Sequence, residues 1–201
     1  GATAGRTTLA GEGLQHQDGH SHVLASTVPP CQAYDPAFAF EVAAIIQAGI
    51  TRMHGNDDER TAGFDRDVFY YLTLYNENYP MPAMPTDLDP AHIVRGLYRW
   101  KPERPEMLRH ATVLFSGSAQ GAAHAAVDAL ATLGIGVELW SATSYTALRE
   151  DALTVERWNR LHPNEPSRVP LVTELLADAK GPIVAVTDFM KIVPEQVARF
   201  L

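Results

Sequence analysis

The strongest fold signal is the run ATVLFSGSAQGAAHAAVDALATLGIGVELW at residues 111–140. It begins and ends with apolar segments, 111–115 and 136–140, that are typical of buried strands. Between them, residues 118–133 form an alanine-rich stretch that stops before Gly134, as expected for a helix. A helix between two buried strands indicates a βαβ unit, so we expect an α/β fold with a mostly parallel sheet.

The sequence on the C-terminal side continues the alternation. We expect a helix over residues 145–161, a second helix over 169–176 and a third strand over 183–187. A last helix is predicted to open at Pro194, because proline is well tolerated in the first turn of a helix. These elements extend the βαβ pattern to the end of the sequence.

Upstream, residues 68–75 (VFYYLTLY) are β-branched and aromatic without alternation, which predicts a strand covered on both faces. The prolines within 76–85 exclude a helix or a central strand there. A short helix is expected around 91–98. The polar, proline-containing stretch 101–109 is the best candidate for a domain boundary.

The N-terminal part carries weaker signals. Residues 22–28 are predicted as a short strand that stops at the two prolines that follow. An Asp-Pro step at Asp35 is expected to open a helix whose apolar stripe ends near Gly55. The charged residues 56–67 show no apolar periodicity, which indicates a solvated surface loop.

Composition bounds the function. The 201 residues include 16 Lys plus Arg against 24 Asp plus Glu, which gives a formal net charge of −8. This charge argues against broad binding of nucleic acid or anionic membranes, because both need a positive field. Cys31 is the only cysteine, so neither an internal disulfide nor a multi-cysteine zinc site can form. We expect no membrane segment and a reducing, cytoplasmic setting.

The densest chemistry lies in residues 11–22, GEGLQHQDGHSH. Glycines let a loop approach a ligand closely, and histidine transfers protons near neutral pH. Glu12 precedes His16 by four residues and could orient it or stabilise its charge. The alternative is a surface turn in which Asp18 and the histidines cap backbone N–H groups.

Two ligand sites compete with this interpretation. His16, His20 and His22 could bind a metal ion, as in a hydrolase, but the Asp-Gly step between the first two favours a turn over the helix that would align them. Residues 117–121 (GSAQG) lie between a strand and a helix, where backbone N–H groups can hold phosphate. They lack the Lys-Ser/Thr of a P-loop, and Ser118 as a helix N-cap explains them without a ligand.

Several strings together resemble one family. They are GRTTLAGEGLQHQDGHSH (5–22), YDPAFAFEVA (34–43), LYNENYPMPAMP (74–85), ERWNRLHP (156–163) and TDFMK (187–191). The chain resembles the thiamine-diphosphate-dependent, pyruvate-decarboxylating component of bacterial pyruvate dehydrogenase complexes, in its single-chain homodimeric form. The resemblance runs from residue 5 to the last residue, and its first string is highly specific.

The resemblance implies a fold, cofactors and partners. Residues 1–100 would be the end of a pyrimidine-binding domain with a linker, and 106–201 an incomplete transketolase C-terminal-like domain. Thiamine diphosphate and Mg²⁺ would sit at a homodimer interface, where pyruvate is decarboxylated. The acetyl group would pass to a lipoyl domain of the dihydrolipoyl acetyltransferase component. The cofactor would carry the carbanion chemistry, while protein groups supply position and proton transfer.

The resemblance also assigns site residues. His16 matches the family's active-site histidine, and Glu12 matches a carboxylate close to that site; both are expected to be catalytic. His20 and His22 are expected to shape the loop. The family's Mg²⁺-diphosphate signature is absent, which predicts an internal segment of a longer, catalytically competent polypeptide. The competing hypothesis is a dimerisation or scaffold module without chemistry of its own.

Overall fold

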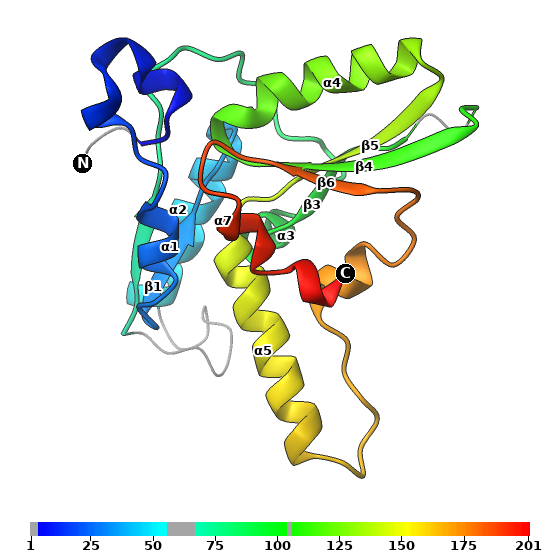
Figure 1. Cartoon of the computed structure of the whole chain (residues 1–201). Helices are drawn as coiled ribbons and strands as arrows, with labels where there is room; N and C mark the ends of the chain where they lie inside the picture. Colours follow the sequence, from blue (N-terminus) through cyan, green and yellow to red (C-terminus); the bar gives the residue numbers. More distant parts are fainter. Residues whose placement is uncertain (1–3, 56–66, 104–105) are drawn as a thin grey trace.

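The computed structural model describes residues 4–55, 67–103 and 106–201 and contains two sheets (Figure 1). A small parallel sheet pairs β1 (Cys31–Tyr34) with β2 (Phe69–Leu72). A larger sheet has the order β3-β5-β4-β6, with bounds Tyr98–Lys101 for β3, Arg109–Phe115 for β4, Ile135–Ser141 for β5 and Ile183–Val186 for β6. Only β3 runs antiparallel to its neighbour. The predicted α/β fold with a mostly parallel sheet is therefore confirmed.

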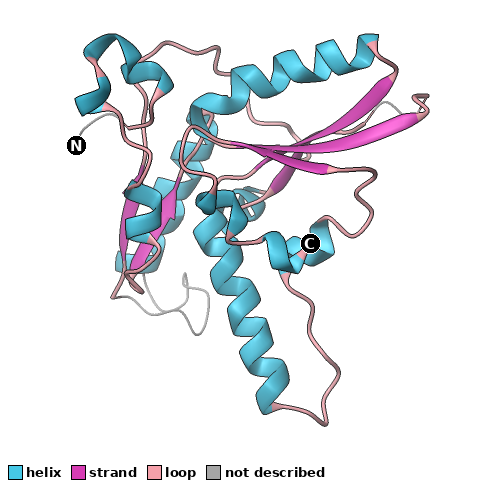
Figure 2. Cartoon of the chain, viewed as in Figure 1, coloured by secondary structure: helices cyan, strands magenta, loops and turns pink. Residues whose placement is uncertain are grey.

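Helices cover both faces of the larger sheet (Figure 2). The α-helices are α1 (Ser21–Ala25), α2 (Ala39–His54), α3 (Pro90–Arg95), α4 (Gln120–Thr132), α5 (Tyr145–Leu161), α6 (Leu171–Leu175) and α7 (Ile192–Glu195). Short 3₁₀ helices are η1 (Thr7–Glu12), η2 (Leu14–His16), η4 (Gly117–Ala119) and η5 (Ala198–Phe200). In the described part of the chain, no helix combines the length and hydrophobicity needed to cross a bilayer.

The β4–α4–β5 unit forms as predicted. Val113 and Phe115 point to the α4 side, where they pack with Leu139 and with Ala123 of α4. Leu114, on the opposite face, packs against the group formed by α5, α6 and α7. This alternation follows from the two-residue period of a strand, which sends successive side chains to opposite faces of the sheet. The two helical layers consequently share one sheet and bury most of its central strands, β4 and β5, while the edge strands β3 and β6 are more exposed.

The helix predicted over residues 145–161 is α5, with the same bounds. It begins there because the Ser144 side chain accepts a hydrogen bond from the Ala147 backbone N–H at 3.0 Å, which caps the first turn. The helix predicted to open at Pro194 instead begins at Ile192. Pro194 is still within the first turn, where backbone N–H groups have no helical partner and proline loses no hydrogen bond.

The strand predicted over residues 22–28 is wrong. These residues belong to α1 and the turn after it, and β1 lies beyond the prolines at Cys31–Tyr34. The cause is Asp18, whose carboxylate accepts from the backbone N–H groups of His20 and Ser21, each at 3.0 Å. Such a carboxylate satisfies the free N–H groups of a first helical turn, so a helix begins where the prediction placed a strand.

The predicted helix start at Asp35 is also wrong, because α2 begins four residues later. The buried Glu41 carboxylate accepts from the backbone N–H groups of Ala37 at 2.5 Å and Phe38 at 3.0 Å, which defines the helix start. The Asp35 carboxylate binds hydroxyl groups of other segments instead. The helix ends at His54, next to Gly55, as predicted.

Two smaller differences concern the middle of the chain. The predicted strand over 68–75 is the shorter β2, and Phe69 is half exposed, so this strand is not covered on both faces within this chain. The predicted helix over 91–98 is α3, which stops at Gly96 because β3 begins at Tyr98. Except for Asp67, the predicted charged loop 56–67 lies outside the described residues. The proposed division between residues 100 and 106 stays a prediction.

Candidate functional site

Residues 5–22, here called the His16 loop, bring the two predicted catalytic residues together. Glu12 is the last residue of η1 and His16 is the last residue of η2. Gly13 connects the two helices with a φ of 99°, a backbone conformation that would be strained in any residue with a side chain. Glu12 Oε2 lies 3.9 Å from His16 Nδ1, and their side chains are 52% and 55% exposed. The pair is therefore within reach of a ligand from solvent.

A second segment holds the carboxylate of this pair. Asn76 Nδ2 donates to Glu12 Oε1 at 3.2 Å, while the other carboxylate oxygen faces His16. Asn76 lies just beyond β2, in the LYNENYP string, and sequence reasoning assigned it no role. The sequence offered one signal: Asn76 directly follows the predicted strand 68–75, and polar side chains that act on ligands often lie after the carboxyl ends of strands.

The other two histidines of the loop separate from His16. The His20 side chain is exposed, and its backbone N–H donates to Asp18. His22 is only 4% exposed, with its ring edge-on to Phe189 at 4.6 Å between centroids. Burial lowers the pKa of His22, outweighing the nearby carboxyls of Asp35 and Asp18, so His22 is neutral at pH 7.

This separation bears on the metal hypothesis. Within residues 4–55, 67–103 and 106–201 there is no group of three or more His, Cys, Asp or Glu side chains that could hold a metal ion. His22 uses Nε2 for Thr73 Oγ1 at 3.2 Å, inside the protein, while His16 and His20 are at the surface. The hydrolase alternative therefore has no support in the described residues.

A buried hydroxyl–carboxylate cluster lies below the loop, at the carboxyl ends of strands from both sheets. Asp35 accepts from Thr73 Oγ1 at 2.7 Å, from the Tyr75 hydroxyl, and from Ser116 Oγ at 2.7 Å. Because the Thr73 hydroxyl donates its hydrogen bond to Asp35, Thr73 Oγ1 is the acceptor for the His22 Nε2–H group. The cluster joins the segments that carry β1, β2 and β4, and sequence reasoning missed it because Asp35 was taken as a helix cap.

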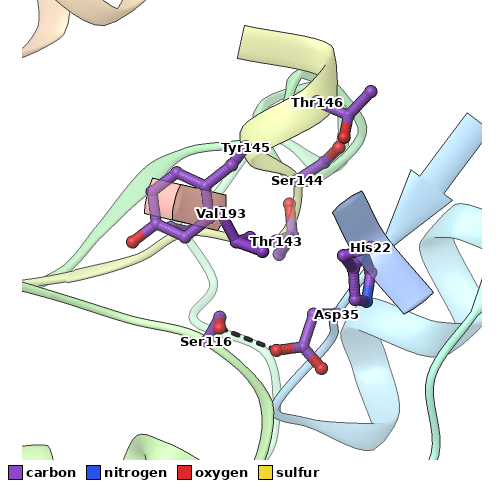
Figure 3. A pocket seen from close by; sticks show the side chains of 9 residues that line it. His22, Asp35, Ser116, Thr143, Ser144, Tyr145, Thr146 and Val193 are labelled. Atoms are coloured by element: carbon purple, nitrogen blue, oxygen red, sulfur yellow. Dashed lines mark hydrogen bonds between the residues drawn. The ribbon is translucent and has the colours of Figure 1, made fainter. Parts of the chain in front are cut away.

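The cluster lines a cavity of about 10 Å³ with His22, Asp35, Ser116 and Tyr145 among its walls (Figure 3). This space suits about one water molecule, so the cluster is too closed for a substrate. The buried Tyr145 hydroxyl has no hydrogen-bond partner among the described residues, and burial raises the pKa of Tyr145.

The same cluster removes the basis for a phosphate site at residues 117–121. A side chain on Gly117, at a φ of 49°, would collide with the Tyr75 hydroxyl and the Asp35 carboxylate. A carboxylate at this point opposes an anionic ligand. The predicted N-cap at Ser118 is wrong: α4 begins after Ala119, with no side-chain cap, and η4 precedes it.

An open groove of about 350 Å³ borders the His16 loop. Its walls combine Leu14 and Met190 with the polar side chains of Arg6, Gln17 and His20. Its volume falls at the lower end of the range for small-molecule sites. Glu12 and His16 are not among its lining residues, but Leu14 and Gln17, on either side of His16 in sequence, are. The groove is therefore open to solvent next to η2, whereas the buried cluster is closed.

The sequence is similar to known proteins along almost its whole length. Residues 1–82 match the family described as pyruvate dehydrogenase E1 component middle domain. The chain is 48% identical over 198 residues to a pyruvate dehydrogenase E1 component of Mycolicibacterium smegmatis, which covers 98% of this chain and 21% of the relative. It is 44% identical over 202 residues to the Pseudomonas aeruginosa and Escherichia coli proteins of the same name, covering 100% of this chain and 22% of each.

Solved structures agree on the fold. Pichia stipitis transketolase, as the H261F mutant, superposes with a TM-score of 0.55 at 17% identity, over 99% of this chain and 27% of that one. The R356L mutant of the same enzyme gives a TM-score of 0.55 at 16% identity, covering 99% and 27%. The fold is therefore transketolase-like. The chain spans about a fifth of the length of the curated relatives it matches.

Proposed function

Because the chain belongs to the family of pyruvate dehydrogenase E1 components over the stretch it shares with them, we propose that it supplies Glu12 and His16 to a pyruvate-decarboxylating active site. In this proposal the complete enzyme oxidatively decarboxylates pyruvate and transfers the acetyl group to a lipoyl group. The observation that carries the proposal is the half-exposed Glu12–His16 pair, at 3.9 Å, within the string that carries the resemblance.

His16 is proposed to donate a hydrogen bond to the oxygen of the bound substrate and to move a proton during acetyl transfer. Glu12 orients the imidazole and stabilises its positive charge, and Asn76 holds Glu12 from the other side. The adjacent groove leaves space for the substrate or for a flexible lipoyl arm. Each of these roles uses a group that solvent can reach.

Thiamine diphosphate and Mg²⁺ belong to this proposal as the cofactors that the resemblance implies. Thiamine diphosphate, when bound, supplies the carbanion that decarboxylation of a 2-oxo acid requires. Within the described residues no cluster of three metal-ligating side chains exists. The His16 imidazole and the Glu12 carboxylate can transfer protons, so they suit the reacting end of the cofactor and not its metal-bound diphosphate. We assign the ligands of Mg²⁺ and of the diphosphate to residues outside this segment.

We further propose a homodimer that works in the cytoplasm with the dihydrolipoyl acetyltransferase component as its partner. Residues 1–100 are assigned to the end of the pyrimidine-binding domain with its linker, and 106–201 to the transketolase C-terminal-like domain. The match of residues 1–82 to the middle domain and the transketolase-like fold support this assignment. Strand β3 connects the two parts, because it pairs with β5 of the larger sheet.

The test is His16→Ala in the full-length enzyme that carries this segment. We expect acetylation of an isolated lipoyl domain, followed by mass spectrometry, to slow by about 100- to 10,000-fold. Thermal unfolding and thiamine diphosphate binding should stay close to wild type. His54→Ala, at the exposed end of α2, is the matched control and should retain its rate.

The double variant Glu12→Ala/His16→Ala tests the scaffold hypothesis in the same assay. If it still turns over pyruvate at the wild-type rate while it dimerises, the segment has no chemical role and the proposed function is wrong. A rate similar to that of His16→Ala alone supports one functional pair, because residues that act as a unit are not additive.

A further inference from the structure

The string TDFMK at residues 187–191 carries part of the family resemblance and lies outside the Glu12–His16 pair. It follows β6 directly and crosses from the larger sheet to the His16 loop (Figure 1). In sequence it lies about 180 residues from the groups it contacts, as the separations of its hydrogen bonds show. The contacts fall on both ends of the His16 loop and leave its centre exposed.

The first end is held by the Asp188 carboxylate. Its Oδ2 atom accepts from the backbone N–H groups of Arg6 at 2.6 Å and Thr7 at 2.8 Å. Its Oδ1 atom accepts from Thr7 Oγ1 at 2.6 Å. Free N–H groups at the start of a helix need an acceptor, and the residue before η1 supplies no side-chain cap of its own. Asp188 therefore caps η1 from a distant part of the chain.

The backbone in front of η1 is shaped around this carboxylate. Gly5 has a φ of 86°, and a Cβ atom placed on it would lie 2.6 Å from Asp188 Oδ2 and 2.8 Å from the Tyr75 ring. A side chain at this position would push the carboxylate off the N–H groups that it accepts from. Partial burial acts to raise the pKa of Asp188, but the hydrogen bonds from Thr7 and Arg6 outweigh it and hold that pKa below its usual value. The cap is consequently ionised at neutral pH.

The second end is held by the residues after Asp188. The Met190 backbone N–H donates to the Gly19 carbonyl oxygen at 3.0 Å. The Phe189 ring packs edge-on against His22, 4.6 Å between ring centroids. Glu12 and His16 lie between these two anchors, on 3₁₀ helices of six and three residues. Helices this short have little stability of their own, so their placement depends on the anchors.

We propose that Asp188 is a positioning residue that sets the Glu12–His16 geometry by capping η1. This inference rests on the proposed function, because it concerns the same pair. A carboxylate suits the position because the Arg6 and Thr7 backbone N–H groups and the Thr7 hydroxyl all donate to it. Asparagine would keep the shape but remove the negative charge, and hydrogen bonds to a neutral acceptor are weaker than those to a carboxylate.

The test is a double-mutant cycle of Asp188→Asn and His16→Gln in the full-length enzyme. We expect Asp188→Asn to lower kcat by about 10- to 100-fold, since a small displacement of a catalytic group costs this much. The KM for pyruvate should change by less than about two-fold, because the variant disturbs the reacting geometry and leaves ground-state binding intact. In the His16→Gln background the same substitution should cost less than about two-fold, because its effect passes through His16.

Hydrogen exchange gives a readout that does not depend on turnover. The peptide covering residues 5–22 should exchange faster in Asp188→Asn, because the Arg6 and Thr7 amides donate more weakly to a neutral acceptor than to a carboxylate. Asp178→Asn removes the same charge from an exposed turn after α6 and should change neither exchange nor kcat. If Asp188→Asn does not fold, Thr7→Val removes one donor to the same carboxylate and replaces it in the cycle.

The outcomes separate the two proposals. A wild-type rate in His16→Gln would overturn the proposed function and this inference together. A slow His16→Gln enzyme with a normal Asp188→Asn enzyme would overturn the inference alone. Equal losses from Asp188→Asn in both backgrounds would also overturn it, because the residue would then act on the fold and not through His16.

Discussion

The β4–α4–β5 unit and the His16 loop differ in where the contacts that order them originate. The unit spans residues 109–141, and its strands pair with each other over their full length, from Arg109↔Ile135 to Phe115↔Ser141. The His16 loop has two short 3₁₀ helices, and the groups that fix them come from Asn76, Asp188 and Met190. The strands of the first region pair with each other across a local helix, whereas the second region is held in place by groups from far along the chain.

This difference has a functional consequence. A region ordered by its own buried strands changes little when one surface contact is lost. A loop held at its two ends by single carboxylates and amides can be displaced by one substitution, without damage to the core. The proposed catalytic pair lies in the region of the second kind, so we expect activity and stability to respond to different residues.

The largest effect on stability should come from a substitution in the buried core of the β4–α4–β5 unit. Phe115 is fully buried at the end of β4 and packs its ring against Phe38 at 5.9 Å between centroids. Phe115→Ala should lower the free energy of unfolding by about 3–5 kcal/mol, from lost burial and the cavity left behind. Chemical denaturation monitored by circular dichroism measures it. A loss below about 1 kcal/mol would contradict the assignment of this unit as the core.

The junction between the two regions should respond next. Gly117 has a φ of 49°, and a side chain there would meet Tyr75 and Asp35. Gly117→Ala should cost about 1–3 kcal/mol, because the left-handed backbone strain and the collision add. Gly121→Ala is the matched control, since a side chain at that helical position meets nothing within 4 Å. A control as destabilised as Gly117→Ala would show that the cluster imposes no constraint.

The buried end of the His16 loop should reveal itself through pH. Burial lowers the pKa of His22 in the folded state below 6.5, the value for an exposed histidine. As the pH falls below 6.5, the unfolded state therefore binds a proton more readily than the folded state does. The contribution of His22 to stability is therefore complete above pH 6.5 and is lost as the pH falls toward the lower pKa of the folded state. The slope from one such group is at most about 1.4 kcal/mol per pH unit.

His22→Gln should flatten this dependence between pH 7 and pH 5, because glutamine can still donate to Thr73 but does not titrate. The buried acids Glu41 and Glu150 have raised pKa values, so their contribution has the opposite sign. For this reason the informative quantity is the difference between variant and wild type at each pH, measured by denaturant midpoints. Parallel curves would place His22 in contact with solvent.

The same contrast explains how much could be predicted from the sequence. Periodicity located β4, α4, β5 and α5, because their apolar positions recur locally, and α5 is also capped by the residue just before it. It failed at α1 and α2, where the Asp18 and Glu41 carboxylates, and not the prolines, define the helix starts. The pairing of Glu12 with His16 followed from a four-residue spacing.

The support of that pair could not be predicted in the same way. Asn76 and Asp188 contact the loop across separations of 64 and 182 residues. A single sequence holds no periodic signal for such contacts, because no local rule links an amide or a carboxylate to a loop so distant. Asn76 and Asp188 both lie in strings that carry the family resemblance, but the resemblance assigns a role to neither. Only the folded chain shows that Asn76 contacts Glu12 and that Asp188 caps η1.

The smallest effect on stability, and the sharpest separation of the two regions, is expected at Asn76. Its amide donates to Glu12 at 3.2 Å on the surface, so Asn76→Ala should change the free energy of unfolding by less than about 0.5 kcal/mol. Activity should still fall about three- to ten-fold, because Glu12 loses the contact that orients it toward His16. Asn78→Ala, two residues away and also exposed, should change neither quantity. Equal rates for both variants would mean that η1 alone positions Glu12. Because Asp188 caps η1, Asp188 would then be the residue that places the pair.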